Sequence, residues 1–205
     1  MDADGYDFSD ASFGERDNDI LDLISEEDLT MFSFDGLKRR SGLHPETLSR
    51  ILGRLEQEGI VEKGPAGGYN VTSKISDFLR LRQTSNGGSY VPLLQTFLPS
   101  DMSVQKLISD LKGKWFGSLR WLGLSDNGEN VTLKWITEDD DIQVDANISE
   151  NALTIQAKFL QNRDYNMALK ASYQLLAHIS RLCSRSGLVR CVAYCGDSDQ
   201  HLMPA

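Results

Sequence analysis

The sequence of 205 residues is short of the groups that build redox, metal and membrane sites. It holds three cysteines, five prolines and three histidines. No apolar run approaches the ~20 residues that cross a bilayer. The chain begins with acidic residues, unlike the basic and then apolar start of an export signal. An odd number of cysteines without an export signal predicts a reducing cytoplasm as the compartment and no role at a membrane.

Motifs that carry catalysis are also missing. The sequence has no glycine-rich phosphate loop, no nucleophile elbow and no helical His-Glu-x-x-His pair, which predicts a protein that is not an enzyme and needs no cofactor. Cys183, Cys191, Cys195 and His201 lack the C-x2-C spacing of a zinc site, so idle or buried cysteines are favoured over metal or redox sensing. The run 138–141 lacks the glycine and the spaced ligands of a calcium loop and is expected to be a solvated turn.

Positive charge is scarce, but it is concentrated in one place. The formal net charge is −9, which excludes a general nucleic-acid binder that would coat any duplex. Between Lys38 and Arg54, however, five cations stand against the single carboxylate of Glu46, a local charge of +4. Acidic residues elsewhere would confine binding to that one face of the protein.

The same segment has the pattern of two helices joined by a tight turn. Residues 34–40 are expected to form a short helix, 41–43 the turn, and 45–58 a second helix that starts at Pro45, where a missing N–H costs nothing. One stripe of the second helix is apolar and predicted to be buried. It consists of Leu48, Ile51, Leu52 and Leu55. Gly59 is a typical helix stop.

Two short strands follow this helix. Residues 60–63 and 68–72 alternate as strands do, and the intervening glycines and Pro65 are typical of a turn. The combined pattern, SGLHPETLSRILGRLEQEGIVEK followed by GYNVT, resembles the winged helix-turn-helix of prokaryotic transcription regulators in the broad MarR- and IclR-like manner. The resemblance covers about residues 19–82. It implies a recognition helix at 45–58 that lies in a DNA major groove and a short wing at 61–72. The wing departs from the pattern because its tip is uncharged and only Lys63 stands at its base.

This resemblance identifies a set of candidate DNA contacts. The set is Lys38, Arg39, Arg40, His44, Glu46, Thr47, Arg50, Arg54 and Lys63. Cations there would meet phosphates, and Glu46 could accept a hydrogen bond from cytosine. The plainer interpretation of the charges is a solvated helix face, and the plainer role of His44 is to cap the helix.

The rest of the chain predicts a second folded unit. Residues 1–17 are acidic and expected to be disordered, 18–82 form the winged helix, 83–99 a flexible linker, 100–185 an α+β unit, and 186–205 a tail. Helices are expected at 103–111 and 164–185. Between them, alternating patterns predict strands at 115–124, 131–136, 142–148 and 153–160. The expected fold is therefore α+β: a winged helix-turn-helix followed by an antiparallel four-stranded sheet with one wet face, flanked by two helices.

Several roles are open to the second unit. The three tryptophans, Trp115, Trp121 and Trp135, are expected to be core, with a ligand pocket as the alternative. The long helix at 164–185 is apolar over a wide arc, with Tyr173, Leu176 and Leu182 near one side, which favours a homodimer through that helix. A small-molecule effector or the transcription machinery are the other expected partners of this unit.

The function expected from the sequence is that of a cytoplasmic regulator of transcription that binds double-stranded DNA. The acidic total and the uncharged wing favour one alternative. In that alternative the winged helix binds proteins, in the transcription machinery or in a chromosome-associated assembly, with little direct DNA contact.

Overall fold

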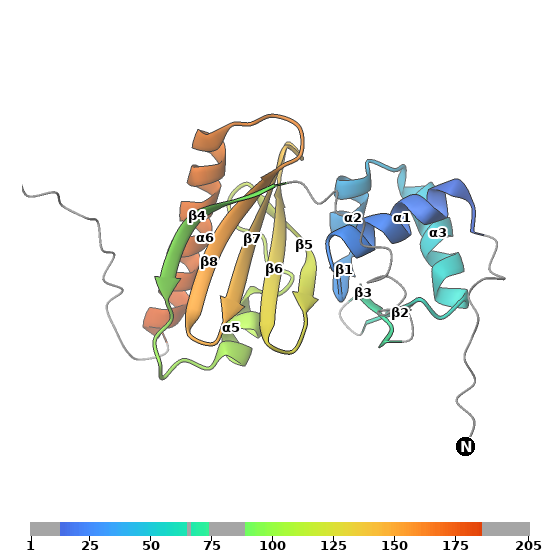
Figure 1. The fold of residues 1–205 in the computed structure, drawn as a ribbon. Helices are drawn as coiled ribbons and strands as arrows, with labels where there is room; N and C mark the ends of the chain where they lie inside the picture. The colour runs from blue at the N-terminus through green and yellow to red at the C-terminus, as the bar shows by residue number, and fades with distance from the viewer. Residues whose placement is uncertain (1–12, 65–66, 74–88, 186–205) are drawn as a thin grey trace, which may run out of the picture.

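The computed structural model describes residues 13–64, 67–73 and 89–185, and these form an α+β fold (Figure 1). The described residues contain five helices and one antiparallel sheet of eight strands. The strand order is β2-β3-β1-β5-β6-β7-β8-β4. The four-stranded sheet expected for the second unit is therefore wrong, because the strands of both units belong to one sheet.

Residues 13–73, the N-terminal unit, contain three helices and three short strands. These are α1 (Glu15–Glu26), β1 (Met31–Ser33), α2 (Phe34–Ser41), α3 (Pro45–Gln57), β2 (Val61–Lys63) and β3 (Gly68–Val71). The elements α2, α3, β2 and β3 lie within a few residues of their predicted ranges. The apolar stripe predicted for α3 is fully buried in a core shared with α1 and β1.

Local chemistry explains where the helices of this unit begin and end. The side chain of Ser33 caps α2 by accepting a hydrogen bond from the Gly36 N–H at 3.0 Å. Gly42 ends α2 in the left-handed conformation, with φ at 66°, which a glycine adopts without strain. Pro45 occupies the first turn of α3, as predicted.

Residues 89–185, the second unit, contain five strands and two helices. These are β4 (Tyr90–Phe97), α5 (Val104–Leu111), β5 (Leu119–Asp126), β6 (Asn130–Thr137), β7 (Ile142–Ser149), β8 (Ala152–Phe159) and α6 (Tyr165–Arg185). Strand β4 falls inside the range predicted as a linker. Its alternation is interrupted by a bulge between Pro92 and Leu94, and a proline in the run favours a loop in the sequence pattern.

Helices α5 and α6 lie on one face of the sheet, with α6 running along its back in Figure 1. That face is apolar and forms the core of the second unit. Trp121 and Trp135 belong to this core, with ring centroids 5.2 Å apart. Trp115 does not: it precedes β5 in a turn and is 57% exposed, so its predicted core role is wrong.

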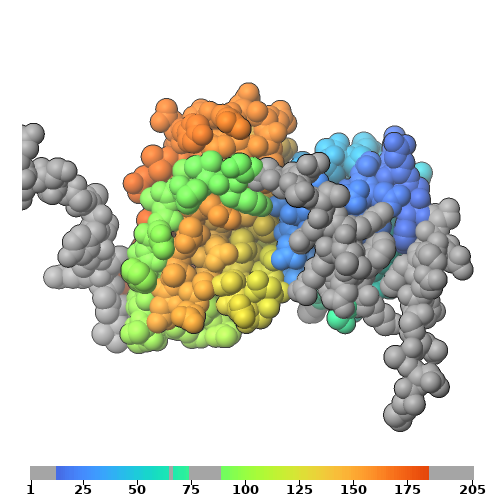
Figure 2. Space-filling view, in the orientation of Figure 1, coloured from blue at the N-terminus to red at the C-terminus, as the bar shows by residue number. Residues whose placement is uncertain are grey.

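The two units meet where β1 pairs with β5. Met31 lies opposite Leu124, and Phe32 lies opposite Gly123. A Cβ at Gly123 would lie 2.3 Å from the Met31 carbonyl oxygen, and one at Gly36 would lie 2.5 Å from the Leu122 Cα. Both glycines are therefore required for β1 and α2 to approach β5. In the space-filling view the blue atoms of the N-terminal unit lie directly against yellow atoms of the second (Figure 2).

Some sequence predictions lie outside the described residues. These are the tail up to residue 12 that was expected to be disordered, the end of the predicted winged helix at 74–82, the linker up to residue 88, and the tail from 186 with Cys191, Cys195 and His201. Within the described ranges, no helix combines the length and the apolar character that spanning a membrane requires.

Candidate nucleic-acid interface and the junction behind it

The outer face of α3 is polar and turned away from both cores. It carries His44, Pro45, Glu46, Ser49, Arg50, Arg54 and Gln57, all exposed. The side chain of Arg50 is the most exposed of the predicted cations, at 71%. Beside this face, Lys63 at the base of the β2–β3 hairpin approaches Glu56 of α3, with Nζ and Oε2 2.8 Å apart. The helix and the hairpin thus present one continuous surface.

Every cation predicted to contact DNA lies in an ion pair with a described carboxylate. The pairs are Lys38–Asp35, Arg39–Asp140, Arg40–Glu27, Arg50–Glu46, Arg54–Asp17 and Lys63–Glu56. Exposed pairs of this kind contribute only about 0–1 kcal/mol, so a phosphate can replace the carboxylate at low cost. That applies to Arg50 and Lys63, whose side chains are exposed, and to a smaller extent to the half-buried Lys38, whose partner Asp35 is exposed.

Two of the predicted DNA contacts are engaged between the units instead: Arg39 binds the second unit, and Arg40 binds the buried Glu27. The Arg39 guanidinium donates to the Glu138 carbonyl oxygen at 3.5 Å and to Asp140 Oδ1 at 3.4 Å, both in the β6–β7 turn. Arg40 donates to Glu27 Oε1 at 3.1 Å, and its side chain is largely buried. The acidic turn 138–141 was expected to be a solvated turn. Its Glu138 carbonyl and Asp140 carboxylate also bind Arg39 of α2.

Arg54 and His44 have structural roles as well as exposure. Arg54 donates hydrogen bonds from two nitrogens to the carboxylate of Asp17 on α1, and that carboxylate is almost fully buried. Hydrogen bonding to Asp17 is the main reason that the pKa of Arg54 is raised. His44 caps α3, accepting from the Glu46 N–H at 3.4 Å. Thr47 is half-buried.

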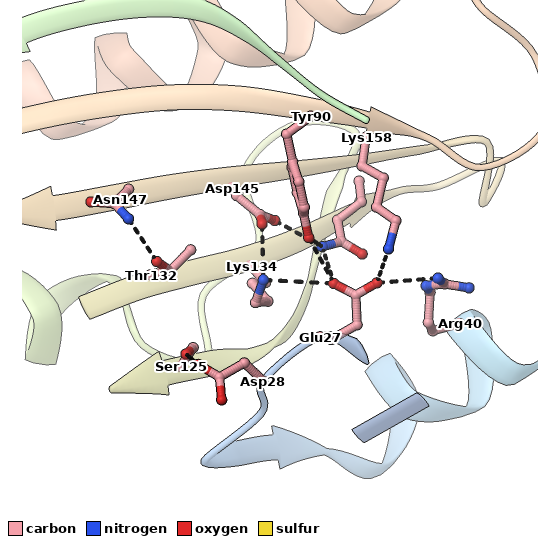
Figure 3. Close-up of polar contacts among 11 residues, drawn as sticks. Glu27, Asp28, Arg40, Tyr90, Ser125, Thr132, Lys134, Asp145, Asn147 and Lys158 are labelled. Carbon is pink, nitrogen blue, oxygen red and sulfur yellow. Dashed lines mark hydrogen bonds and ion pairs between the residues drawn. The ribbon is translucent and has the colours of Figure 1, made fainter. Parts of the chain in front are cut away.

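Behind this surface, one buried carboxylate joins the two units. Glu27, just after α1, has a side chain with no exposure to solvent. Figure 3 shows it surrounded by groups from four strands of the second unit and from α2. Oε1 accepts from Lys158 at 2.7 Å and from Arg40; Oε2 accepts from Gln143 at 2.7 Å and from the Tyr90 hydroxyl at 3.0 Å.

Strand register brings these partners together on the face of the sheet opposite α6. Lys134 lies directly across from Asp145, and Lys158 lies between Gln143 and Tyr90 on the neighbouring strands. The Lys134 ammonium donates to Asp145 at 2.9 Å and lies 3.6 Å from Glu27. This part of the sheet was expected to be wet, but Lys134, Gln143, Asp145 and Lys158 are buried.

The electrostatics of this cluster keep Glu27 ionised. Burial alone would raise its pKa, but the charges of Lys134 and Lys158, with hydrogen bonds from Lys158 and Gln143, outweigh burial and lower the pKa to about 2. Burial also tends to lower the pKa of Lys134, and the two carboxylates Asp145 and Glu27 reverse that effect and raise it. The pKa of Tyr90 is raised by burial and by the same carboxylates, so its hydroxyl remains a donor.

The other candidate sites considered from the sequence are a metal or redox site and a dimer surface on α6. In the described part of the chain, no group of three His, Cys, Asp or Glu residues could hold a metal ion, and Cys183 is buried in the core of the second unit. On α6, Leu176 and Leu182 are half-buried and pack against the unit's own core. The large apolar residues exposed on this helix are Tyr165, Met167, Leu169 and Tyr173. Dimerisation through α6 stays a prediction.

The cluster around Glu27 was not found from the sequence. Glu27 lies in the run Glu26-Glu27-Asp28, in which nothing distinguishes a buried carboxylate from exposed neighbours. One signal was present: Lys134 and Asp145 fall at facing positions of neighbouring strands once the turn at 138–141 is accepted. Opposite charges placed in register across two strands indicate a pair.

Comparison of the chain with protein-family models, with curated proteins and with solved structures finds no match, so its function has to be argued from its own geometry.

Proposed function

We propose that the N-terminal unit is a winged helix-turn-helix that binds double-stranded DNA through the outer face of α3, and that the protein regulates transcription. The observation that carries the proposal is the exposure of that face. Its reading positions, Glu46 and Arg50 near the start of α3, are free of the second unit, with Lys63 of the hairpin alongside. In this fold such residues reach base edges, and the hairpin follows the backbone.

The two arginines at the junction take a different part in this proposal. Arg39 holds α2 against the β6–β7 turn of the second unit, and Arg40 binds Glu27 at the junction, so that α3 is presented in a fixed direction. Arg50 is the principal contact with DNA because its only described partner is an exposed carboxylate four residues away. Arg54 contributes charge near the groove while it anchors α1.

A second candidate function is favoured by the charge of the N-terminal unit. Residues 13–73 carry seven Lys and Arg against twelve Asp and Glu, a net charge of −5. DNA-binding modules are normally basic, and here each predicted cation already has a carboxylate partner. A surface of this kind suits a protein partner that offers both signs of charge, such as a subunit of the transcription machinery.

Fluorescence anisotropy with labelled duplexes at two salt concentrations tests the proposal. Replacing Arg50 and Arg54 by alanine should weaken binding more than tenfold, because each charged contact to a base or phosphate contributes on the order of 1–3 kcal/mol. The loss should be greater at low salt, where phosphate contacts dominate. The single Arg50→Ala variant should account for most of it, since it leaves the Arg54–Asp17 contact intact.

The matched control is Lys112→Ala with Lys170→Ala, which removes the same charge from exposed positions of the second unit. It should leave DNA affinity within about twofold, since neither lysine lies near α3. Equal affinity of the folded Arg50 and Arg54 variant and the wild type would reject DNA contact by α3 and leave the protein-binding function.

A further inference from the structure

A hollow in the second unit has the size and the lining of a ligand site. Its volume is about 470 Å³, within the range of small-molecule pockets. It opens between α5, the turn before β5, and α6. Its lining consists of Lys106, Asp110, Lys114, Trp115, Phe116, His178 and Leu182.

Aromatic groups form one side of the hollow, and they are held in place. Phe116 is buried and packs on the His178 ring, with centroids 4.2 Å apart. The Lys114 carbonyl accepts a hydrogen bond from the Trp135 indole at 2.9 Å, which ties the turn to the core. Trp115 nevertheless stands exposed, with the Arg120 guanidinium 4.9 Å from the centre of its ring.

The charge at the rim is positive in an acidic protein. Lys106 and Lys114 are exposed, and no described carboxylate lies within ion-pairing distance of either ammonium group. This contrasts with the cations of α2 and α3, each of which is paired. Asp110 is the one carboxylate in the lining, so the charged lining is positive by one, with Arg120 adding a cation beside Trp115.

We propose that this hollow binds a small planar aromatic carboxylate as an effector. The ring of the ligand stacks on Trp115 and covers Phe116, and its carboxylate accepts charge-assisted hydrogen bonds from Lys106 and Lys114. Asp110 opposes the negative charge of the ligand and limits its affinity.

A line of contacts leads from this hollow to α2. Arg120, over the Trp115 ring, forms an ion pair with Glu138 at 3.0 Å. Glu138 lies in the β6–β7 turn, whose backbone and whose Asp140 hold Arg39 of α2. A ligand that competes for Arg120 therefore shifts the turn that holds α2. The regulatory meaning of this link rests on the proposed function of α2 and α3, whereas ligand binding does not.

Two-dimensional NMR of the full chain tests the site with naphthalene-2-carboxylate as the probe. The indole N–H resonance of Trp115, assigned with Trp115→Phe, should shift with a Kd of about 1 mM, typical of a small unoptimised ligand. The Trp121 indole, in the core, is the internal reference. Naphthalene-2-carboxamide has the same rings without the charge and should bind at least about tenfold more weakly.

Variants of the rim sharpen the result. Replacing Lys106 and Lys114 by glutamine should weaken probe binding about tenfold, Asp110→Asn should strengthen it, and Lys112→Gln, an exposed neighbour outside the lining, should change nothing. The site is rejected if the Trp115 indole does not respond at about 10 mM probe. It is also rejected if the amide binds equally well, or if Lys112→Gln matches the double variant.

The link to α2 has its own readout, which needs no DNA. Probe binding should shift the side-chain Nε–H resonance of Arg39 in the wild type. Glu138→Gln should abolish that shift and should also strengthen probe binding, because it removes the carboxylate that competes with the ligand for Arg120. A bound probe that leaves Arg39 unaffected in the wild type would refute the link and retain the site.

Discussion

At the junction, the Arg40 guanidinium meets a glutamate with no exposure to solvent, whereas on the outer face of α3 the Arg50 guanidinium meets a glutamate that water surrounds. The residue types are the same, but their energetic consequences differ. A charge out of water must keep its partners, since a single missing partner leaves an uncompensated ion. A charge in water can exchange one partner for another at little cost. The junction is suited to fixing geometry, and the outer face is suited to binding.

The largest difference between the two regions should come from their carboxylates. Glu27→Ala should lower the free energy of unfolding by about 3–5 kcal/mol, because Lys134 and Lys158 would remain buried without their main partner. The matched control is Glu26→Ala, the exposed preceding residue, which should stay within about 0.5 kcal/mol. Urea unfolding monitored by tryptophan fluorescence measures both. Similar values for the two variants would mean that the Glu27 cluster does not hold the units together.

The next largest difference between the two regions should be in how their contribution to stability depends on pH. The pKa of Glu27 is about 2 in the folded protein against an ordinary value of 4.5. Because the folded pKa is the lower one, the stabilisation is complete above pH 4.5 and is lost as pH falls towards 2. Its full size is about 3 kcal/mol. Asp145 acts in the opposite sense because its pKa is raised, chiefly by burial.

Comparison with Glu27→Gln isolates the contribution of Glu27 to this pH dependence. The wild type should lose its advantage in unfolding free energy over this variant between about pH 5 and pH 2. Denaturant titrations at several pH values provide the measurement. A difference that stays constant over that range would contradict an ionised Glu27 in the folded protein.

Alanine substitutions at two helical glycines should change stability by smaller amounts and with opposite signs. Alanine is favoured over glycine in a helix by about 1 kcal/mol. At Gly53, on α3, no atom other than the neighbouring residues and the helix's own backbone lies within 4 Å of an added Cβ, so Gly53→Ala should stabilise by about that amount. At Gly36 the new Cβ would lie 2.6 Å from the Trp121 carbonyl oxygen, so Gly36→Ala should destabilise by about 1–3 kcal/mol. Thermal unfolding of the two variants measures both effects. Stabilisation by both substitutions would mean that α2 does not pack closely against β5.

The outer face was predictable from sequence, and the junction was not. Helix α3 follows from local signals: Pro45 at its start, the Leu48–Leu55 stripe, and Gly59 at its end. These signals act within a few residues, so one segment is enough to show them. The pairing of β1 with β5 joins residues about ninety positions apart, and only Gly36 and Gly123 mark it in the sequence. A glycine in the sequence does not indicate which distant segment will pack against it.

The sequence pattern gives the wrong prediction for strand β4 and for Trp115, and the reasons are related. In β4 the bulge at Pro92 disturbs the alternation that identifies a strand, and its pairing with β8 is decided by tertiary contacts. Trp115 has the spacing of a strand residue, but Gly117 turns the chain between it and β5, with φ at 56°. Hydrophobic patterns therefore located most elements, while glycine turns and bulges altered where individual side chains point.

The most direct test of the account is an NMR map of the wild-type protein with a short duplex of mixed sequence at low salt. Nonspecific binding is electrostatic, so the map does not require the natural DNA site. We expect the largest shifts at Glu46, Ser49 and Arg50 of α3 and at Lys63, with little change at the Gln143 side-chain amide of the junction. Shifts confined to the second unit, or no shifts at any DNA concentration, would contradict DNA binding by the outer face of α3.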